Sequence, residues 1–410
     1  MNLDIKNRIE QIKNGEVPEG YTNKYHIKPD SWKDEPLNMF FYKVKDKNHE
    51  KRYDTVFTNS AANGVIPQNE YFEKDIANEE NIDGYYIVNA EDYIYNPRIS
   101  EKAPYGPINQ NRTGYTGIAS PLYTVFAKKE NVCVCDEYVR YYLGSTEWNK
   151  YIYSVANYGA RFDRMNISDN DFMNMPIALP QIEEQQKIAE ILMQCDKVIE
   201  LKQKRIEEEK KLLKYLMKIM LSPNFDAKSD ESTLGWRKCH LEDVCDIATG
   251  DKDVQNKVEV GKYPFFIRSE KVERIDTFSY DGEAILIPGD GKIGEVFHYI
   301  NGKFDFHQRV YKISDFNKDC SGKYVYYYLK LNFKKRAMTM TAKATVDSLR
   351  RDMLTRMEVV LPDIEHQKKI VEVLDTQNSI IEKQEQELQR WQEKKKSLMQ
   401  LLLTGVIRVK

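Results

Sequence analysis

The chain has 410 residues, of which 41% are hydrophobic and 31% charged, and its formal net charge is −2. This length allows two or three domains with separate cores, and the near-neutral charge excludes a uniformly basic nucleic-acid coat. No apolar run approaches the roughly 20 residues that a membrane span needs, and the N-terminal MNLDIKNRIEQIKNG lacks the apolar centre of a signal peptide, so we expect a cytoplasmic protein.

The six cysteines fit neither a disulfide framework nor a zinc site. Cys133 and Cys135 form a C-x-C, and Cys239, His240 and Cys245 stand close in sequence without a fourth ligand nearby. We therefore expect buried thiols, no metal and no cofactor.

The first half of the chain has the pattern of a mixed α/β domain followed by a long helix. The domain begins near Trp32, and the helix follows LPQIEEQQKIAEIL at 179–192, where Pro180 and the acidic residues after it suit a helix N-terminus. Apolar residues then recur every seven positions, which predicts a partner helix. These residues are Leu192, Ile199, Ile206, Leu213 and Met220.

The second half repeats this plan after Pro223 and a polar linker. A second α/β stretch begins near Trp236 and leads to LPDIEHQKKIVEVL at 361–374, which matches the first phrase at nine of fourteen positions. Likewise, YVRYYL at 138–143 corresponds to YVYYYL at 324–329. The second helix is expected to end near Gly405, a C-cap position, and Lys395 interrupts its heptads, whose apolar members are Leu374, Ile381, Leu388 and Leu402.

We expect the two helices, each of about 40 residues or roughly 60 Å, to pack on each other as a spacer between two domains. The alternative is two separate surface helices, each packed on its own domain. The copies also differ, because Asp196 corresponds to Asn378 and Arg164 corresponds to Val346. These differences argue against equal roles for the two copies.

The doubled phrase after each α/β domain resembles the specificity (S) subunit of type I restriction-modification systems. YNPRIS, YGPI and GIASPLYTVF in the first half, GDGKIGEVF and FHQRVY in the second, and the closing SLMQLLLTGVIRV are similar to phrases of that family. The resemblance implies a DNA-recognition subunit that reads a bipartite target with one domain per half-site. It also implies that partner subunits carry out methylation and cleavage, so the chain itself is not expected to be an enzyme.

The fold implied by this resemblance is two mixed α/β (α+β) target-recognition domains joined by two long antiparallel coiled-coil helices, a pseudo-twofold internal repeat. The expected partners are double-stranded DNA, two modification (methyltransferase) subunits and up to two restriction subunits, without a membrane. The expected boundaries are 1–178 for the first domain, 179–222 for the first helix, 223–235 for the linker, 236–360 for the second domain, 361–405 for the second helix and 406–410 for the C-terminal tail.

Candidate DNA contacts come from basic and polar loop residues, because such side chains reach base edges and phosphates. Residues 330–356 contain eight basic residues against two acidic ones, whereas 70–92 contain eight acids against one lysine. A solvated charged face or an ordinary exposed loop is the alternative reading in each case. The candidates are Arg98, Lys102, Arg112, Tyr115, Arg161, Lys292, Lys343, Arg350 and Arg351.

No motif predicts a catalytic site. GDGKIG at 289–294 has the G-x-G-x-x-G spacing, but the apolar runs around Asn301-Gly302 after it predict a β-hairpin instead of the helix that dinucleotide binding requires. YNPR at 95–98 lacks the second proline of an adenine-methyltransferase loop. Two other functions remain open at this point, a coiled-coil scaffold that does not read DNA and a stand-alone DNA-modifying enzyme.

Overall fold

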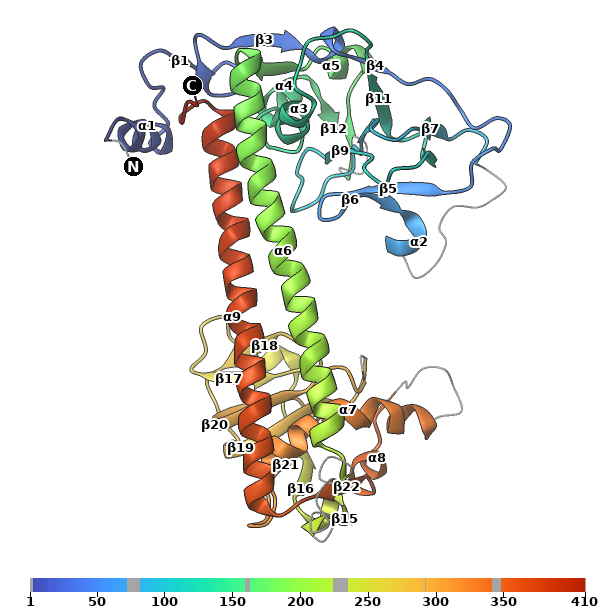
Figure 1. Ribbon diagram of the computed structural model, residues 1–410, viewed down its shortest axis with the longest axis vertical. Coiled ribbons are helices and arrows are strands. Elements are labelled where there is room, and N and C mark those ends of the chain that lie inside the picture. Colours follow the sequence, from blue (N-terminus) through green and yellow to red (C-terminus); the bar gives the residue numbers. More distant parts are fainter. Residues whose placement is uncertain are drawn as a thin grey trace. The chain divides into compact units, whose positions relative to one another are not determined.

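The computed structural model describes residues 3–71, 82–158, 163–223, 235–291, 293–340 and 348–409. The chain divides into two compact units, Met1–Leu201 with Gln389–Lys410, and Lys202–Leu388. Each unit combines a mixed α/β domain with parts of two long helices (Figure 1). No helix in these described ranges is long and apolar enough to span a bilayer.

The first unit contains two small four-stranded sheets. Its helices are α1 (Leu3–Lys13), η1 (Leu37–Met39), α2 (Gln68–Tyr71), α3 (Asp136–Leu143), α4 (Asn149–Val155) and α5 (Asp169–Met173). Its strands are β1 (Tyr21–Thr22), β2 (Lys28–Pro29), β3 (Lys33–Pro36), β4 (Phe41–Lys43), β5 (Val56–Ser60), β6 (Gly64–Pro67), β7 (Tyr86–Val88), β8 (Tyr93–Tyr95), β9 (Ile108–Gln110), β10 (Gly117–Ala119), β11 (Thr124–Lys128), β12 (Asn157–Tyr158), β13 (Met165–Asn166) and β14 (Pro176–Leu179). The sheet orders are β6-β5-β10-β7 and β4-β11-β8-β9.

The second unit is built on one six-stranded sheet of order β16-β21-β19-β20-β17-β18. Its strands are β15 (Arg237–His240), β16 (Asp246–Thr249), β17 (Tyr263–Phe266), β18 (Val272–Ile275), β19 (Tyr280–Pro288), β20 (His298–Phe306), β21 (Val310–Ser314) and β22 (Glu358–Leu361). Its helices are η5 (Leu241–Asp243), η6 (Val254–Asn256), α7 (Gly322–Thr339) and α8 (Arg351–Thr355).

The two units share the elements that precede each long helix. In the first, β14 pairs antiparallel with β3, and in the second β22 pairs antiparallel with β15. Helices α3 and α7, which carry the repeated tyrosines and are called the tyrosine helices below, occupy equivalent positions. The Tyr138 hydroxyl donates to the Ala178 carbonyl of β14 at 2.7 Å, and the Tyr324 hydroxyl donates to the Val360 carbonyl of β22 at 2.9 Å. The predicted repeat is therefore present in the fold as well as in the sequence.

The repeated Leu-Pro phrase supplies one buried glutamine to each unit. Gln185 donates to the Pro180 carbonyl at 2.9 Å and accepts from the Cys135 N–H at 3.0 Å. Gln367 donates to the Pro362 carbonyl at 2.8 Å and accepts from the Ser321 N–H at 2.8 Å. Cys135 and Ser321 are the N-cap residues of α3 and α7. The same side chain thus joins the start of a long helix to the start of a tyrosine helix in both copies, which gives the repetition a structural reason.

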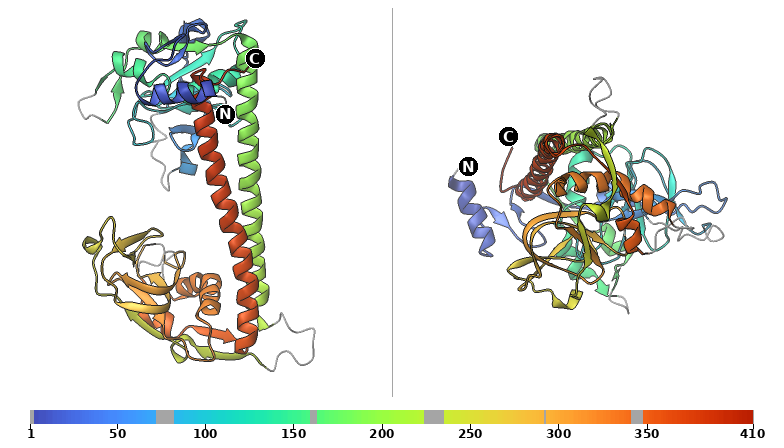
Figure 2. Two further views of the ribbon diagram at one scale, coloured as in Figure 1. Left: turned by 90° about the vertical axis from the view of Figure 1, so that its left-hand side faces the viewer. Right: turned by 90° about the horizontal axis from the view of Figure 1, so that it is seen from below.

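The long helices are α6 (Ile182–Met220) and α9 (Ile364–Leu403), of 39 and 40 residues. In the first unit Lys395 of α9 forms an ion pair with Asp196 of α6. In the second unit Lys202 pairs with Glu387 at 2.7 Å, and Lys210 pairs with Glu385 at 2.6 Å. Partner numbers fall along α9 as they rise along α6, so the helices run antiparallel and lie side by side within each unit (Figures 1 and 2). The prediction of two α/β domains with two long paired helices is confirmed.

Most of the heptad positions are buried where the helices meet their own unit. Leu192 and Leu402 belong to the core of the first unit, and Leu213, Met220, Leu374 and Ile381 to that of the second. Ile206 is also buried, while Ile199 and Leu388 are half-buried. Lys395, which interrupts the series, places its ammonium on Asp196 and 5.2 Å from the ring centre of Tyr141.

The C-terminal residues are part of the first unit. Gly405 follows α9 with a φ of 63°, a left-handed conformation that suits glycine at a helix C-cap, as expected from the sequence. Arg408 then donates to both carboxylate oxygens of Glu184, at 2.7 and 2.8 Å, and its guanidinium lies 5.7 Å from the ring centre of Trp32. The tail therefore closes onto the start of α6.

The predicted hairpin at Asn301-Gly302 is wrong. Both residues lie inside the nine-residue strand β20, and Gly302 faces Gly282 of β19 with φ values of 140° and 154°. Continuous pairing with β19 provides more hydrogen bonds than a local turn, so the tertiary partner overrides the turn propensity. The GDGKIG segment nevertheless lies between two strands, β19 and β20, as predicted.

Candidate nucleic-acid interface

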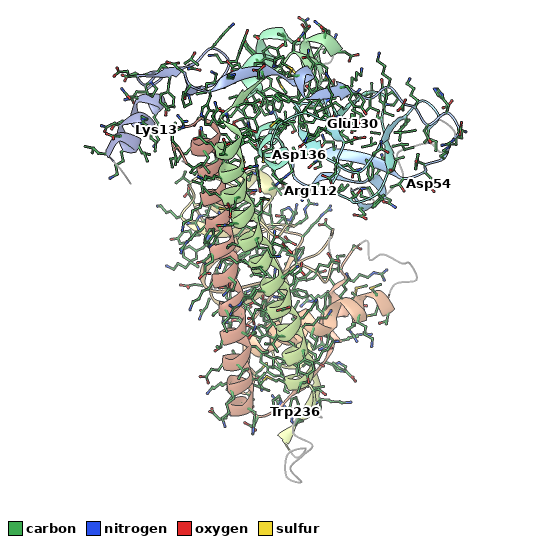
Figure 3. All side chains as sticks on the ribbon, turned by 45° about the horizontal axis from the view of Figure 1, so that its top comes forward. Lys13, Asp54, Arg112, Glu130, Asp136 and Trp236 are labelled. Atoms are coloured by element: carbon green, nitrogen blue, oxygen red, sulfur yellow. The ribbon has the colours of Figure 1, made fainter. Side chains whose placement is uncertain are left out.

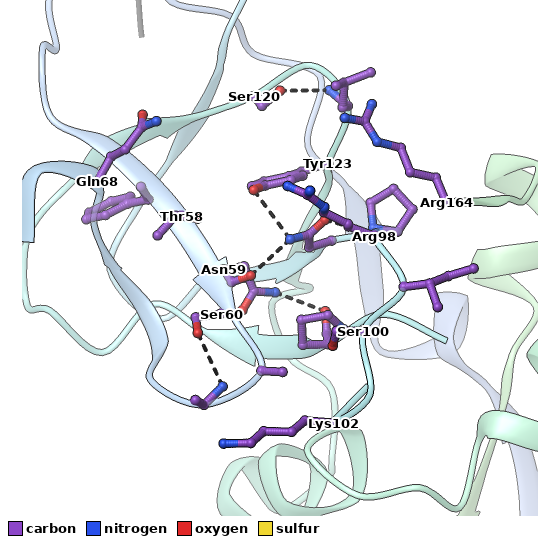
Figure 4. Close-up of a pocket in the computed structure, with 18 of the residues that line it drawn as sticks. Thr58, Asn59, Ser60, Gln68, Arg98, Ser100, Lys102, Ser120, Tyr123 and Arg164 are labelled. Atoms are coloured by element: carbon purple, nitrogen blue, oxygen red, sulfur yellow. Dashed lines mark hydrogen bonds between the residues drawn. The ribbon is translucent and has the colours of Figure 1, made fainter. Parts of the chain in front are cut away.

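The first domain contains a cavity of about 660 Å³ between strand β5 and the segment that follows β8. One wall comes from β5 and carries Thr58, Asn59 and Ser60, and the other comes from the segment after β8 that carries Arg98 and Lys102 (Figure 4). Arg164 reaches the same cavity, because residues 98 and 164 form an antiparallel bridge.

Buried amides hold the walls of this cavity in place. Asn59 is almost fully buried and donates to the carbonyls of Ile94 at 2.6 Å and Pro107 at 2.9 Å. Asn96 donates to the Asn59 carbonyl at 3.0 Å and, more weakly, to the Tyr123 hydroxyl at 3.4 Å. The loop that presents the basic residues is thus tied to the sheet, which reduces the ordering cost of binding.

The three basic side chains of the cavity have no ion-pair partner within 4 Å among the residues that the structure describes. Arg98 and Lys102 are exposed, and Arg164 is half-buried. Unpaired guanidinium and ammonium groups beside amides and hydroxyls can donate to phosphate oxygens and to base edges. Sequence reasoning selected Arg98 and Lys102 but not Arg164, for which only the mismatch with Val346 was a signal.

Arg112 and Tyr115 lie elsewhere in the first domain. Arg112 lies 3.6 Å from Glu137, beside the first turn of α3 that Asp136 marks in Figure 3, so part of its charge is compensated. Tyr115 is 44% exposed, and its ring centre lies 5.7 Å from that of Phe57. Among the described candidates of this domain, the structure therefore brings together only Arg98 and Lys102.

Three candidates, Arg161, Lys292 and Lys343, lie outside the described residues. Of the remaining second-domain candidates, Arg351 begins α8 and lines a hollow with Arg356 and three acids, Glu242, Asp246 and Asp352. The three acids outnumber the two arginines, which does not favour phosphate. Arg350 is exposed at the N-cap of α8.

Part of the basic segment 330–356 has a structural role. Arg336 of α7 donates to the carbonyls of Met353 at 3.1 Å and Arg356 at 2.6 Å, and Lys334 pairs with Glu295 at 2.6 Å. These cations fasten α7 to neighbouring segments, so the local positive charge of the sequence overstates the charge available to DNA.

The described residues contain no group of three or more His, Cys, Asp or Glu side chains close enough to hold a metal ion. Of the six free cysteines, Cys245 and Cys320 are buried, and burial raises the pKa of the Cys320 thiol to about 12. The expectation of buried thiols is wrong for Cys133, which is exposed in the connection between β11 and α3, and Cys135, Cys195 and Cys239 are only partly buried.

Comparison with known families now identifies the two domains. The family described as "Type I restriction modification DNA specificity domain" matches residues 38–210 and again 234–390. The chain belongs to this family. Each match begins in an α/β domain and ends within a long helix, α6 or α9, so the specificity domain is the unit of the internal repeat.

Curated relatives include specificity subunits from a bacterium and an archaeon. The chain is 29% identical over 170 residues to the type I restriction enzyme EcoDI specificity subunit of Escherichia coli, covering 41% of this chain and 37% of that protein. It is 28% identical over 270 residues to the MjaVIII specificity subunit of Methanocaldococcus jannaschii, covering 58% of this chain and 64% of that protein. In both cases the matched part spans less than two thirds of the relative's length.

Solved structures show the same fold. A chain from a structure of the assembly and conformational transition of the type I restriction-modification system aligns over 92% of this chain and 99% of its own, with a TM-score of 0.56 and 16% identity. The crystal structure of the type I S subunit from M. genitalium aligns over 90% of this chain and 96% of its own, with a TM-score of 0.52 and 14% identity. Both cover the two specificity domains together with their helices.

Proposed function

We propose that this chain is the sequence-specific DNA-recognition subunit of a type I restriction-modification complex, and that it reads a split target with one specificity domain per half-site. The observation that carries the proposal is the presence of two matches to the specificity domain in one chain, each of which ends within a long helix. Their loops differ in sequence and structure, which supports two different half-sites and therefore an asymmetric target.

In this proposal the cavity of Arg98, Lys102 and Arg164 contacts the first half-site. Its unpaired cations supply the electrostatic attraction, and the tied amides around them supply a fixed geometry. Arg112, Tyr115, Arg161, Lys292, Lys343, Arg350 and Arg351 remain further candidates for DNA contact.

The domain boundaries given by the sequence, 1–178 and 236–360 with helices at 179–222 and 361–405, are part of the same proposal. The heptad residues of the two helices would then hold the domains at a fixed separation along the duplex. Methylation and cleavage would be carried out by two modification subunits and up to two restriction subunits in the cytoplasm, and the chain would contribute no catalytic group.

The test is a comparison of genomic methylation in the host with and without this gene, by sequencing that detects modified bases. Loss of methylation at one split, asymmetric motif is the expected result and gives both half-sites at once. Loss at a continuous motif would contradict reading by two domains. No change, with the gene and its partner subunits expressed, would favour a scaffold that does not read DNA.

A further inference from the structure

The turn between β20 and β21 presents two polar side chains from a rigid backbone. The Val310 N–H donates to the His307 carbonyl at 2.9 Å, the Gln308 N–H to the Lys252 carbonyl at 2.8 Å, and the Gly289 N–H to the Arg309 carbonyl at 2.7 Å. Gln308 and Arg309 are exposed, while His307 and Val310 are buried. The backbone of this turn is thus held from both neighbouring loops.

His307 supports the turn from below. The residue is 2% exposed, and its Nδ1 accepts the Arg309 N–H at 2.9 Å. Burial lowers the pKa of His307, which keeps the ring neutral and the nitrogen free to accept. The direction in which Arg309 leaves the backbone is therefore fixed.

Two arginines converge on one carboxylate at this turn. Asp290 accepts from Arg309 at 3.2 Å and from Arg268 at 3.0 Å through the same oxygen. The Arg309 side chain is 65% exposed and that of Arg268 is 42% exposed, whereas that of Asp290 is only 22% exposed. The Asp290 carboxylate is therefore more deeply buried than the two guanidinium groups, and its ion pairs hold both of them at the surface.

The three residues meet because two strand ends, those of β17 and β19, converge on the turn between β20 and β21. β17 runs parallel to β20, with Phe266 opposite Phe306, so Arg268 follows one strand and Arg309 follows the other. β19 ends with Pro288 opposite Val310, which brings Asp290 to the same place. The bound carboxylate carries one negative charge against two positive ones, so the group keeps a net charge of +1.

This geometry favours a backbone phosphate over a base edge. Each guanidinium has five N–H donors and uses one of them on Asp290, so most donors stay available for phosphate oxygens. A side chain that reads a base must extend into the groove, whereas these two are held back by their ion pairs. Two further acids lie near this turn: Asp251 is balanced by Lys252, whereas Asp253 accepts from the neutral Gln308 amide at 3.2 Å and keeps its negative charge.

We propose that Arg268 and Arg309, positioned by Asp290 and His307, form a phosphate-binding clamp that anchors the second specificity domain on the DNA backbone without reading sequence. The ligand is a phosphodiester of duplex DNA. This proposal rests on the proposed function, because it assigns the clamp to the DNA-binding face of that domain.

The test uses the chain in complex with its modification subunit and two duplexes of equal length, one with the split motif and one without it. Arg309→Ala and Arg268→Ala should each weaken binding to both duplexes by the same factor, roughly tenfold, as for the loss of one charge-assisted hydrogen bond. Each should also reduce the slope of log Kd against log salt by about 0.9. Arg309→Lys should retain part of the affinity, and the methylated motif should stay unchanged in every variant.

Lys318→Ala is the matched control, because it removes one positive charge beyond the opposite end of β21 and should leave affinity and salt slope unchanged. Relaxed methylation at one base of the motif in Arg309→Lys would overturn the clamp in favour of base reading. Unchanged affinity and slope in the double variant that combines Arg268→Ala with Arg309→Ala, with the wild-type complex still binding its split site, would overturn the clamp alone. Failure of the wild-type complex to prefer the split site would instead overturn the proposed function.

Discussion

Replacing Gln367 with alanine should destabilise the second domain strongly and locally. Gln367 is 0% exposed and makes three hydrogen bonds, to the carbonyls of Pro362 and Asp319 and from the N–H of Ser321. A buried polar group without a partner costs about 1–3 kcal/mol, and water entering the vacated space returns part of this. We therefore expect a loss of about 3–5 kcal/mol in the free energy of unfolding of this domain.

Gln185 provides an internal comparison, because it makes two such bonds, to Pro180 and from Cys135. Gln185→Ala should cost about 1 kcal/mol less than Gln367→Ala and should act on the first domain only. The matched control is Gln392→Ala, an exposed glutamine on the same helix as Gln367, which should have almost no effect.

Hydrogen–deuterium exchange followed by mass spectrometry can measure these losses domain by domain, which a single melting curve of a two-unit chain cannot do. In Gln367→Ala the amides of the first turn of α7 should exchange at least 100-fold faster, the rate equivalent of about 3 kcal/mol. The amides of α3 should keep their wild-type rates. If α7 exchanges within tenfold of wild type, the glutamine does not hold the helix start, and the reasoning is refuted.

Three further predictions concern the first domain. Burial raises the pKa of Glu147 to about 7 from 4.5, so its folded form binds the proton more tightly than the unfolded one. Stability should therefore fall by up to roughly 3 kcal/mol as pH rises from 4.5 to 7; Glu147→Gln should flatten this dependence in urea titrations. Arg408→Ala should cost about 1.5–3 kcal/mol, because it leaves the buried Glu184 without its bidentate partner, and a lower unfolding midpoint would measure it. The double change Arg98→Ala and Lys102→Ala should weaken binding of the split target at least tenfold in titrations of the assembled complex.

Each of these three predictions has a matched control and an opposing outcome. Glu130→Gln changes an exposed glutamate of the same domain and should leave the pH dependence as it is; an equal effect of both changes would mean that burial of Glu147 is not the cause. Asp92, whose pKa burial raises to about 6, adds to the same slope and should account for what remains in Glu147→Gln. Lys13→Ala removes an exposed charge from α1 and is the control for the other two predictions. If it lowers the unfolding midpoint as much as Arg408→Ala, the prediction for Glu184 fails. If it weakens DNA binding as much as the double change at Arg98 and Lys102, the prediction for the cavity fails.

The long helices and their ends could be predicted because their signals are local. The repeat could be predicted because its two copies can be aligned within the sequence. A heptad pattern, a proline near a helix start and a glycine at a C-cap report the conformation of the segment in which they stand. The hairpin prediction at Asn301-Gly302 failed because long-range pairing decides the conformation there. A turn propensity is also local, but β20 has a nine-residue partner in β19, and the long-range pairing outweighs it.

The candidate DNA contacts were harder to predict, because convergence in space depends on topology. Arg98 and Lys102 are four residues apart and were selected together, whereas Arg164 reaches their cavity through a bridge across 66 residues. Arg268, Asp290 and Arg309 follow three different strands and meet because β17 ends beside β20 and β19 ends beside the start of β21. The net charge along the sequence also misled, since Arg336 is bonded to backbone carbonyls and Lys334 is paired with Glu295 at the surface.

The differences between the two copies show which contacts the repeat preserves. Asp196 accepts from Tyr141 at 2.5 Å, and the second unit has Asn378 at the corresponding sequence position. There, Tyr327 donates instead to Asp375 at 2.7 Å, an acid one helical turn earlier on α9. The tie between tyrosine helix and long helix is thus kept while the residue that makes it moves.

Each domain thus has two parts: a frame, made of the buried contacts between the α/β core and the long helices, and a set of exposed cationic loops. Backbone-directed bonds, such as those of Gln185 and Gln367, recur at equivalent positions because any substitution would leave buried carbonyls unsatisfied. The cationic loops differ between the copies: Arg98 and Lys102 make no ion pair among the described residues, whereas Arg268 and Arg309 share Asp290. A domain built in this way can exchange its loops without losing its attachment to the helices, which under the proposed function would let the two half-sites differ in sequence.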